Sequence, residues 1–246
     1  MQTETDPDID WVAALSHRDV RTAARAVGEA AEERRLFRHL SAEHDREGRS
    51  SYIEIDAPLE LFALVRILRP AHVVEVGVSS GVSSAYLLQA LMRNDSGTLH
   101  SVDLPKVDRR TPSTGSRRGP SWSLPSGRAS GWAVPFALRR RWDLRLGDKA
   151  DVLPLLAAEL PRVEMLVYDV PHDDRVAARE FRLLDPLLPP GAVLIADHGP
   201  GGGLCHALAG RARAWGSHPV RRQRLGLYGA RRRDVRAPAG PRGRRR

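Results

Sequence analysis

The chain has 246 residues, of which 41% are hydrophobic, so it is long enough to fold around a sizeable core. No apolar run approaches the roughly 20 residues of a membrane helix, and the acidic start, MQTETDPDID, is unlike a secretory signal. The single cysteine, Cys205, excludes an intramolecular disulfide and argues against a cysteine-based zinc site. These features predict a cytoplasmic protein that does not enter a membrane.

The net charge of +9 is concentrated in two segments. Residues 221–246 hold eleven arginines and one acidic residue, for a charge of +10, and residues 106–145 carry a charge of +8. Such a basic end either binds nucleic acid or anionic lipid, or is simply solvated. We interpret residues 231–246 as a solvated, Arg-rich tail, with nucleic-acid binding as the alternative.

The first 50 residues are predicted to form an N-terminal helical extension. Residues 11–48 are rich in Ala, Glu and Arg and contain no proline, and Gly28 and Gly48 are the expected break points. A second helix is predicted over residues 58–69, where a proline begins the helix and another follows its end.

Short β-branched strands then alternate with helices. Strands are predicted at residues 72–77, 98–103, 142–148, 163–169 and 191–198, helices at 83–94, 150–160, 175–188 and 204–216, and a closing antiparallel pair within 218–230. This alternation indicates βαβ units. We therefore predict that residues 51–230 form a doubly wound α/β domain with a mostly parallel, seven-stranded, Rossmann-like sheet.

One segment interrupts the alternation. Residues 105–141 are rich in Pro, Ser, Gly and Arg, and long irregular inserts in compact domains are usually functional lids or disordered loops. The insert leaves the carboxyl end of the second strand, which is the ligand-binding edge of an open α/β sheet. A lid and a disordered insert are equally compatible with this composition.

Three acidic residues lie at the ends of three successive predicted strands. The motif Glu75-Val-Gly77-Val-Ser-Ser-Gly81 joins a strand to a helix, where glycines allow a tight turn and the helix N-terminus presents free N–H groups. Glu75 is expected to receive a positively charged group. Asp103 is placed to bind both ribose hydroxyls, and Asp148 to reach an adenine amino group. The set predicts a nucleoside ligand.

The ordered motifs VVEVGVSSGVSSAYLLQAL, LHSVDLP and LRLGDKADVLP resemble the class I methyltransferase superfamily. The run from GWAVPFALRRRWDLRLGD through VYDVPHDD to GAVLIADH is similar to its bacterial branch called methyltransferase family 24, which typically acts on small molecules. The resemblance covers about residues 52–230. It implies S-adenosylmethionine (SAM) as cofactor, with Gly77 and Gly81 at its methionine end, Asp103 at the ribose and Asp148 at the adenine. Ser79, between the two glycines, is a further candidate cofactor-binding residue.

The chemical groups are expected at the ends of the fourth and fifth strands. His172 is the candidate general base, because an unperturbed imidazole has a pKa of about 6.5, and Asp169 is the second candidate catalytic residue. Asp169, Asp197 and His198 are candidate ligands for Mg²⁺ or Mn²⁺. Metal-dependent relatives carry Asp-Asn where this chain has Asp197-His198, so a metal-assisted scheme and a metal-free scheme both stay open.

The expected activity is SAM-dependent methylation of a small molecule, most simply O-methylation of a hydroxyl group. The alternatives are an RNA methyltransferase, for which the basic tail is the argument, and a SAM-binding protein without methyl transfer. The expected partner is a small-molecule acceptor, and a homodimer is the open alternative to a monomer. The sequence contains no Asn-Pro-Pro-Tyr-type motif for base methylation.

Overall fold

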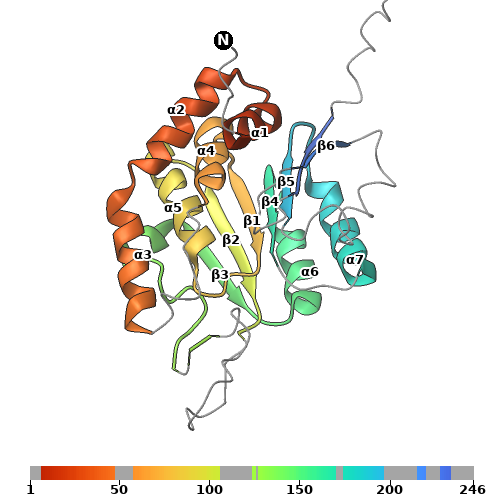
Figure 1. Ribbon diagram of the computed structural model, residues 1–246. Coiled ribbons are helices and arrows are strands. Elements are labelled where there is room, and N and C mark those ends of the chain that lie inside the picture. The colour runs from red at the N-terminus through yellow and green to blue at the C-terminus, as the bar shows by residue number, and fades with distance from the viewer. Residues whose placement is uncertain are drawn as a thin grey trace, which may run out of the picture.

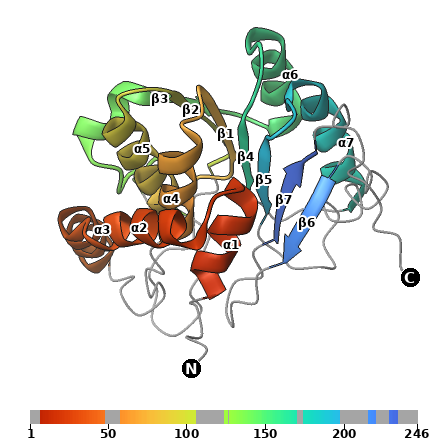
Figure 2. The ribbon, with the colours of Figure 1, turned by 90° about the horizontal axis from the view of Figure 1, so that it is seen from above.

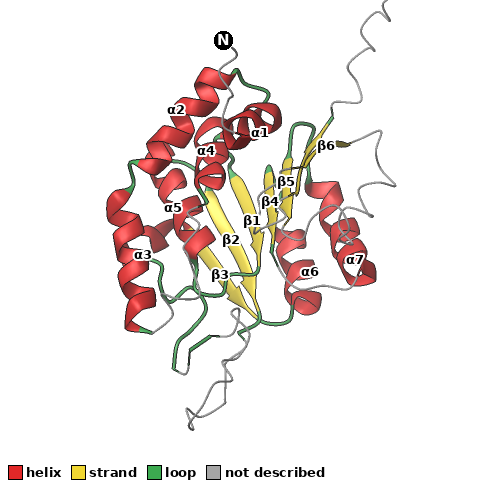
Figure 3. Ribbon diagram, in the orientation of Figure 1, coloured by secondary structure: helices red, strands yellow, loops and turns green. Residues whose placement is uncertain are grey.

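The structure, a computed structural model, describes residues 7–47, 58–105, 124–125, 127–169, 174–196, 215–219 and 228–233. At its centre lies a seven-stranded sheet with the strand order β3-β2-β1-β4-β5-β7-β6 (Figures 1 and 3). The strands are β1 (His72–Val76), β2 (Thr98–Asp103), β3 (Trp142–Leu146), β4 (Met165–Tyr168), β5 (Val193–Ala196), β6 (Trp215–Pro219) and β7 (Tyr228–Arg232). The helices are α1 (Pro7–Ser16), α2 (Val20–Ala31), α3 (Arg34–Arg46), α4 (Leu59–Leu68), α5 (Val82–Asn94), α6 (Lys149–Glu159) and α7 (Asp174–Leu184), with short 3₁₀ segments η1 (Phe136–Arg141) and η2 (Asp185–Leu187).

The predicted doubly wound, mostly parallel sheet is confirmed. Strands β1 to β5 pair in parallel, and β7 runs antiparallel to both β5 and β6. Figure 2 shows α4 and α5 on one face of the sheet, with α1, α2 and α3 outside them, and α6 and α7 on the opposite face. Parallel strands place their carboxyl ends at one edge, so the segments after β1, β2, β3 and β4 come together there.

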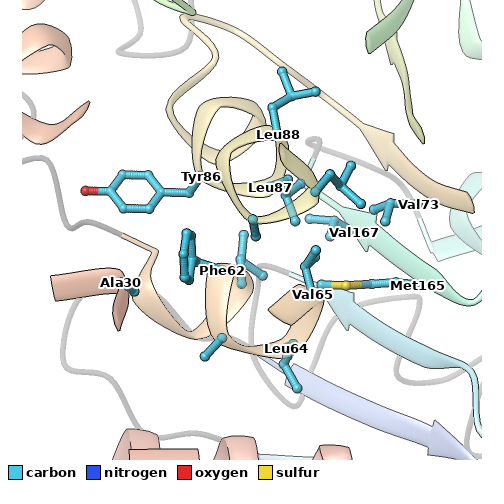
Figure 4. Close-up of a cluster of buried hydrophobic side chains, with 14 of the residues drawn as sticks. Ala30, Phe62, Leu64, Val65, Val73, Tyr86, Leu87, Leu88, Met165 and Val167 are labelled. Atoms are coloured by element: carbon cyan, nitrogen blue, oxygen red, sulfur yellow. The ribbon is translucent and has the colours of Figure 1, made fainter. Parts of the chain in front are cut away.

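The two faces of the sheet bury separate apolar cores. The larger core joins the α4–α5 face to the N-terminal helices, and Figure 4 shows Phe62 and Val65 of α4 on the side of Tyr86 and Leu87 of α5, with Met165 of β4 next to Val65. The smaller core lies between the sheet and the α6–α7 pair. Strands β4 and β5 are buried along their whole length, which explains their continuous apolar sequences. Among the described helices, none has the length and apolar character needed to cross a membrane.

The N-terminal region forms three helices where one long helix with glycine breaks was predicted. Asp19 caps α2, because its carboxylate accepts the N–H of Thr22 at 3.0 Å, and the chain turns again at Glu32–Glu33. Gly28 lies inside α2, so the predicted break there is wrong, and Gly48 lies outside the described residues. The breaks between α1 and α2 and between α2 and α3 are therefore made by a polar N-cap and a local turn, with no glycine at either.

The N-terminal helices belong to the main core. Trp11 and Leu15 of α1 and Leu36 and Leu40 of α3 are buried in the same cluster as the side chains of α4, α5 and β1. The first helices therefore complete the domain, and a fold without them would expose the outer side of α4.

The C-terminal boundary also differs from the prediction. The sheet extends to Arg232, so the basic tail begins later than residue 231. The predicted helix over residues 204–216 overlaps β6, which starts at Trp215, and its earlier part lies outside the described residues. The two arginines at the end of β7 have structural roles. Arg231 Nη1 donates to Leu15 O at 2.6 Å, and Arg232 Nη1 donates to Asp185 O at 2.6 Å.

These contacts define where the tail can be removed. Deleting residues 234–246 should change the free energy of unfolding by less than about 0.5 kcal/mol and leave turnover intact, because their Arg/Pro/Gly composition cannot build a core. A cut after Ala230 removes Arg231 and Arg232 and should lower the melting temperature clearly. Thermal unfolding and methyl-transfer rates of both truncations check this. A large loss of turnover in a folded chain ending at Arg233 would contradict it.

Candidate functional site

The connection from β1 to α5 is a tight turn built on left-handed residues. Gly77 has φ +95°, Ser79 φ +51° and Gly81 φ +92°. The N–H of Gly77 donates to Val102 O at 2.9 Å, which continues the β1–β2 pairing into the turn. A Cβ on Gly81 would lie 2.5 Å from Val134 Cγ2. The glycine at 81 is therefore required both by its backbone conformation and by close packing.

Glu75 lies beneath this turn and is fully buried. Its carboxylate accepts hydrogen bonds from the hydroxyls of Ser83 at 2.6 Å, Ser84 at 2.7 Å and Ser101 at 2.7 Å. The pKa of Glu75 is raised to about 7, chiefly because the carboxyl is buried; the charge of Asp169 acts in the same direction and the three hydroxyls act against it.

The structure thus corrects the prediction that Glu75 receives a positively charged group of the ligand. The side chain has no exposed surface, and the three hydroxyls satisfy both of its oxygens. Its hydrogen bonds tie the end of β1 to the first residues of α5 and to β2, and so support the shape of the turn.

Asp103, the last residue of β2, lies at the open edge beside the turn. Its Oδ1 accepts the N–H of Val78 at 3.2 Å, and its Oδ2 accepts the hydroxyl of Ser130. The residue is partly exposed. A carboxylate has about four lone-pair directions, so after these two bonds Asp103 retains acceptor capacity on each oxygen. This matches the two hydroxyls of a ribose.

Asp148 follows β3 and caps the next helix. Its Oδ1 accepts the N–H of Ala150 at 2.8 Å, which makes it the N-cap of α6. The N–H of the preceding Gly147 donates to Asp103 O at 3.0 Å, so Asp148 lies close to the end of β2. The capping bond accounts for the acidic residue at this position, and an adenine contact stays a prediction.

The second half of the predicted insert packs on the glycine turn. The N–H of Gly131 donates to Ser79 O at 2.8 Å, and the N–H of Ala133 donates to Ser80 O at 3.0 Å. Residues 106–123 and 126 lie outside the described residues. We call residues 128–134 the wall segment, because they cover one side of the turn.

Helix α3 supports the wall segment from behind. Arg128 pairs with Glu47 at 2.6 Å, and its guanidinium lies 5.2 Å from the centre of the Trp132 ring. His44, which is buried, packs on the other part of that ring with a centroid distance of 4.9 Å. The end of the N-terminal region thus contributes directly to the architecture of the site.

The end of β4 brings a further acidic group to the same edge. The N–H of Asp169 donates to Val76 O at 2.9 Å, so Asp169 lies level with Gly77 and its side chain is exposed. The neighbouring Tyr168 is buried, and its hydroxyl donates to Glu180. Burial and this carboxylate raise the pKa of Tyr168 far above its ordinary value, so the phenol stays neutral.

Three predicted site residues lie outside the described residues: His172, Asp197 and His198. Their roles as base and metal ligands stay predictions, as does the metal role of Asp169. Within the described ranges, no three His, Cys, Asp or Glu side chains are grouped as metal ligands. The structure does bring together Gly77, Ser79, Gly81 and Asp103.

Sequence reasoning missed the hydroxyl groups that bond the carboxylates of Glu75 and Asp103. Ser101 stands opposite Glu75 in the β1–β2 register, and a polar pair inside two buried strands is a signal for a buried hydrogen bond. Ser83 and Ser84 begin the helix after the turn. Ser130 carried no such signal, because it sits in an irregular insert 27 residues from Asp103.

The doubly wound fold, the glycine turn after β1 and the carboxylate at the end of β2 define a class I, SAM-dependent methyltransferase. A family model described as a methyltransferase domain matches residues 74–198, which is half of the chain. The chain belongs to this family, methyltransferase family 24, and SAM is its cofactor. No curated protein matches the sequence.

Solved structures show the same fold at low sequence identity. The chain is similar to a putative O-methyltransferase from Klebsiella pneumoniae, with a TM-score of 0.53 and 14% identity over 95% of this chain and 93% of that one. It is also similar to an O-methyltransferase from Bacillus cereus in complex with S-adenosylhomocysteine (SAH), with a TM-score of 0.53 and 13% identity over 80% and 91% of the two chains. A third is the O-methyltransferase TomG from Streptomyces achromogenes, solved with SAM, with a TM-score of 0.52 and 16% identity over 79% and 90%.

Proposed function

We propose that the protein transfers the methyl group of SAM to a hydroxyl of a small molecule. The observation that carries this proposal is the position of Asp169, whose N–H bonds Val76 O at 2.9 Å and which therefore lies beside Gly77 at the cofactor edge. An exposed carboxylate there is suited to orient an acceptor or to hold a cation. The O-methyltransferases of similar fold support the same chemistry.

The residues of the edge fit the cofactor. Gly77, Ser79 and Gly81 would lie along its methionine end, Asp103 would accept the ribose hydroxyls, and Asp148 would approach the adenine. Helix α5 starts at the turn without a side-chain cap on its first N–H groups. These groups are suited to the carboxylate of the methionine part. When bound, SAM supplies an electrophilic methyl on a sulfonium, which leaves as SAH once the methyl is transferred.

The acceptor hydroxyl must lose its proton as its oxygen takes the methyl. In the metal-free scheme, His172 takes this proton, because an imidazole titrates near neutral pH. In the metal-assisted scheme, Asp169, Asp197 and His198 would hold Mg²⁺ or Mn²⁺, which lowers the pKa of a bound hydroxyl. In both schemes Asp169 lies beside the acceptor oxygen.

The test is methyl transfer from labelled SAM to a panel of small hydroxylated acceptors. With an acceptor in hand, the two schemes predict opposite results. Loss of turnover with a chelator, reversed by Mg²⁺ or Mn²⁺, supports the metal scheme. Chelator insensitivity with a loss of about 10²–10⁴-fold in His172→Gln supports the base scheme. His17→Gln, on the exposed connection between α1 and α2, is the matched control.

Two results would count against the proposal. If neither treatment lowers turnover by more than a few-fold, both schemes are wrong and the reacting groups lie elsewhere, the 105–141 insert being the first place to look. If label enters RNA and no small acceptor, the proposed substrate class is wrong.

A further inference from the structure

The wall segment reaches the cofactor edge at one side chain. The Ser130 hydroxyl donates to Asp103 Oδ2, while Asp103 Oδ1 accepts the N–H of Val78 at 3.2 Å. Each oxygen of the carboxylate therefore has one fixed partner from the protein. Two donors on different oxygens set the rotation of the carboxylate plane, and with it the direction of the acceptor sites that remain.

Ser130 is itself held in place. It is 5% exposed, and the backbone on its carboxyl side pairs with the glycine turn through the N–H groups of Gly131 and Ala133, 2.8 Å from Ser79 O and 3.0 Å from Ser80 O. On its amino side, Arg128 pairs with Glu47 of the N-terminal region. A serine fixed from both sides makes a rigid donor, because little conformational entropy remains to be lost on ligand binding.

The wall segment is also tied to the buried Glu75 network. Gly131 has φ +69°, and a Cβ there would overlap the Trp142 ring, so the segment lies directly on this indole. Trp142 Nε1 donates to Ser101 Oγ at 2.9 Å, and Ser101 in turn donates to Glu75. One connected set of hydrogen bonds thus runs from the turn through β2 to the indole beneath the wall segment.

We propose that Ser130 is a positioning residue for the cofactor ribose, acting through Asp103. The hydroxyl holds the carboxylate so that both oxygens face the two ribose hydroxyls together. This inference rests on the ribose role of Asp103 in the proposed function. It assigns to the insert a part of the cofactor site, and it makes Ser130 important for affinity without any contact with the reacting methyl group.

The experiment measures SAH binding to the full chain by calorimetry, with no acceptor present. Ser130→Ala should weaken SAH binding about three- to tenfold, the usual effect of one lost hydrogen bond. Ser130→Cys, which keeps the volume but donates poorly, should weaken it similarly. Ser16→Ala is the matched control, because Ser16 is 4% exposed and its hydroxyl donates to Ala13 O within the last turn of α1. Its affinity should equal that of the wild type.

Two further measurements separate positioning from general packing. In an Asp103→Ala background, Ser130→Ala should change SAH affinity by less than about twofold, because the two residues act through one contact. SAH analogues that lack the 2′- or 3′-hydroxyl should show a smaller Ser130→Ala effect than SAH itself. Equal losses with the deoxy analogues, or additive losses in the double variant, would overturn the inference.

The design distinguishes failure of the inference from failure of the proposed function. If Asp103→Ala binds SAH as tightly as the wild type, the ribose assignment is wrong and the role of Ser130 falls with it. These SAH affinities are measured without an acceptor. O-methylation of a small molecule is therefore tested separately, by the labelled-SAM assay.

Discussion

Replacing Gly81 with alanine should lower the free energy of unfolding by about 2–5 kcal/mol and abolish tight SAM binding. Gly81 has φ +92°, which a residue with a Cβ adopts only under strain. The added Cβ would also lie 2.9 Å from Gly131 Cα, and a backbone atom cannot rotate away as the Val134 methyl can. The turn and the wall segment must separate, which displaces Ser130 from Asp103.

The measurement is chemical unfolding together with SAH calorimetry, with Gly28→Ala as the control. Gly28 lies exposed inside α2, with open space where a Cβ would be placed. That substitution should stabilise the protein by about 0.5–1 kcal/mol and leave affinity unchanged. If Gly81→Ala is as stable and binds as tightly as wild type, the turn does not have the close packing described above.

The second large effect is a pH dependence of stability that originates at Glu75. Its pKa is raised from 4.5 to about 7 in the folded protein, so folding takes up a proton between these values. A group whose pKa is higher in the folded chain than in the unfolded chain stabilises the fold fully at pH values below its unfolded-state pKa. This stabilisation is lost as the pH rises through the folded-state pKa. Wild-type stability should therefore fall by about 3 kcal/mol from this group as pH increases from about 4 to about 8.

Glu75→Gln is the variant that isolates the effect, because a neutral amide of the same shape has no charge to bury. We expect the difference in unfolding free energy between variant and wild type to shift in favour of the variant as pH rises. Urea unfolding at a series of pH values measures it, and other titrating groups cancel in the difference. A difference that is the same at every pH would mean that the Glu75 carboxyl has one pKa in the folded and unfolded chain.

The sheet was predictable because its strands are short, apolar and separated by helices of regular length. Every parallel strand, β1 to β5, lies within its predicted range. The signal is clearest in β4 and β5, where burial on both faces leaves a continuous apolar sequence. The predicted C-terminal boundary of the domain was less accurate. Arg231 and Arg232 look like the start of a basic tail, and only their bonds to distant carbonyls reveal them as the end of a strand.

The site was predictable only where local sequence determines it. The turn from Gly77 to Gly81 has its signature in the glycines, and Asp103 in its place after a strand. The carboxylate of Glu75 is satisfied by three hydroxyls from two other elements, so the expectation that it receives a positively charged group was wrong. The bond from Ser130 spans an irregular segment, and neither periodicity nor spacing reports a contact of that kind.

The bond from Arg231 to Leu15 has a consequence for how the chain is made. The two residues are 216 positions apart, so the carboxyl end of the first helix gains its donor only after nearly all of the chain has left the ribosome. Contacts of such long sequence separation form late, because the loop that they close is long. Helix α1 can pack on α2 and α4 during synthesis, but the Leu15 carbonyl gains its partner only when β7 is made. Interrupted translation before Arg231 should therefore release chains with a nearly complete sheet and a loosely held first helix, an easy substrate for quality-control proteases.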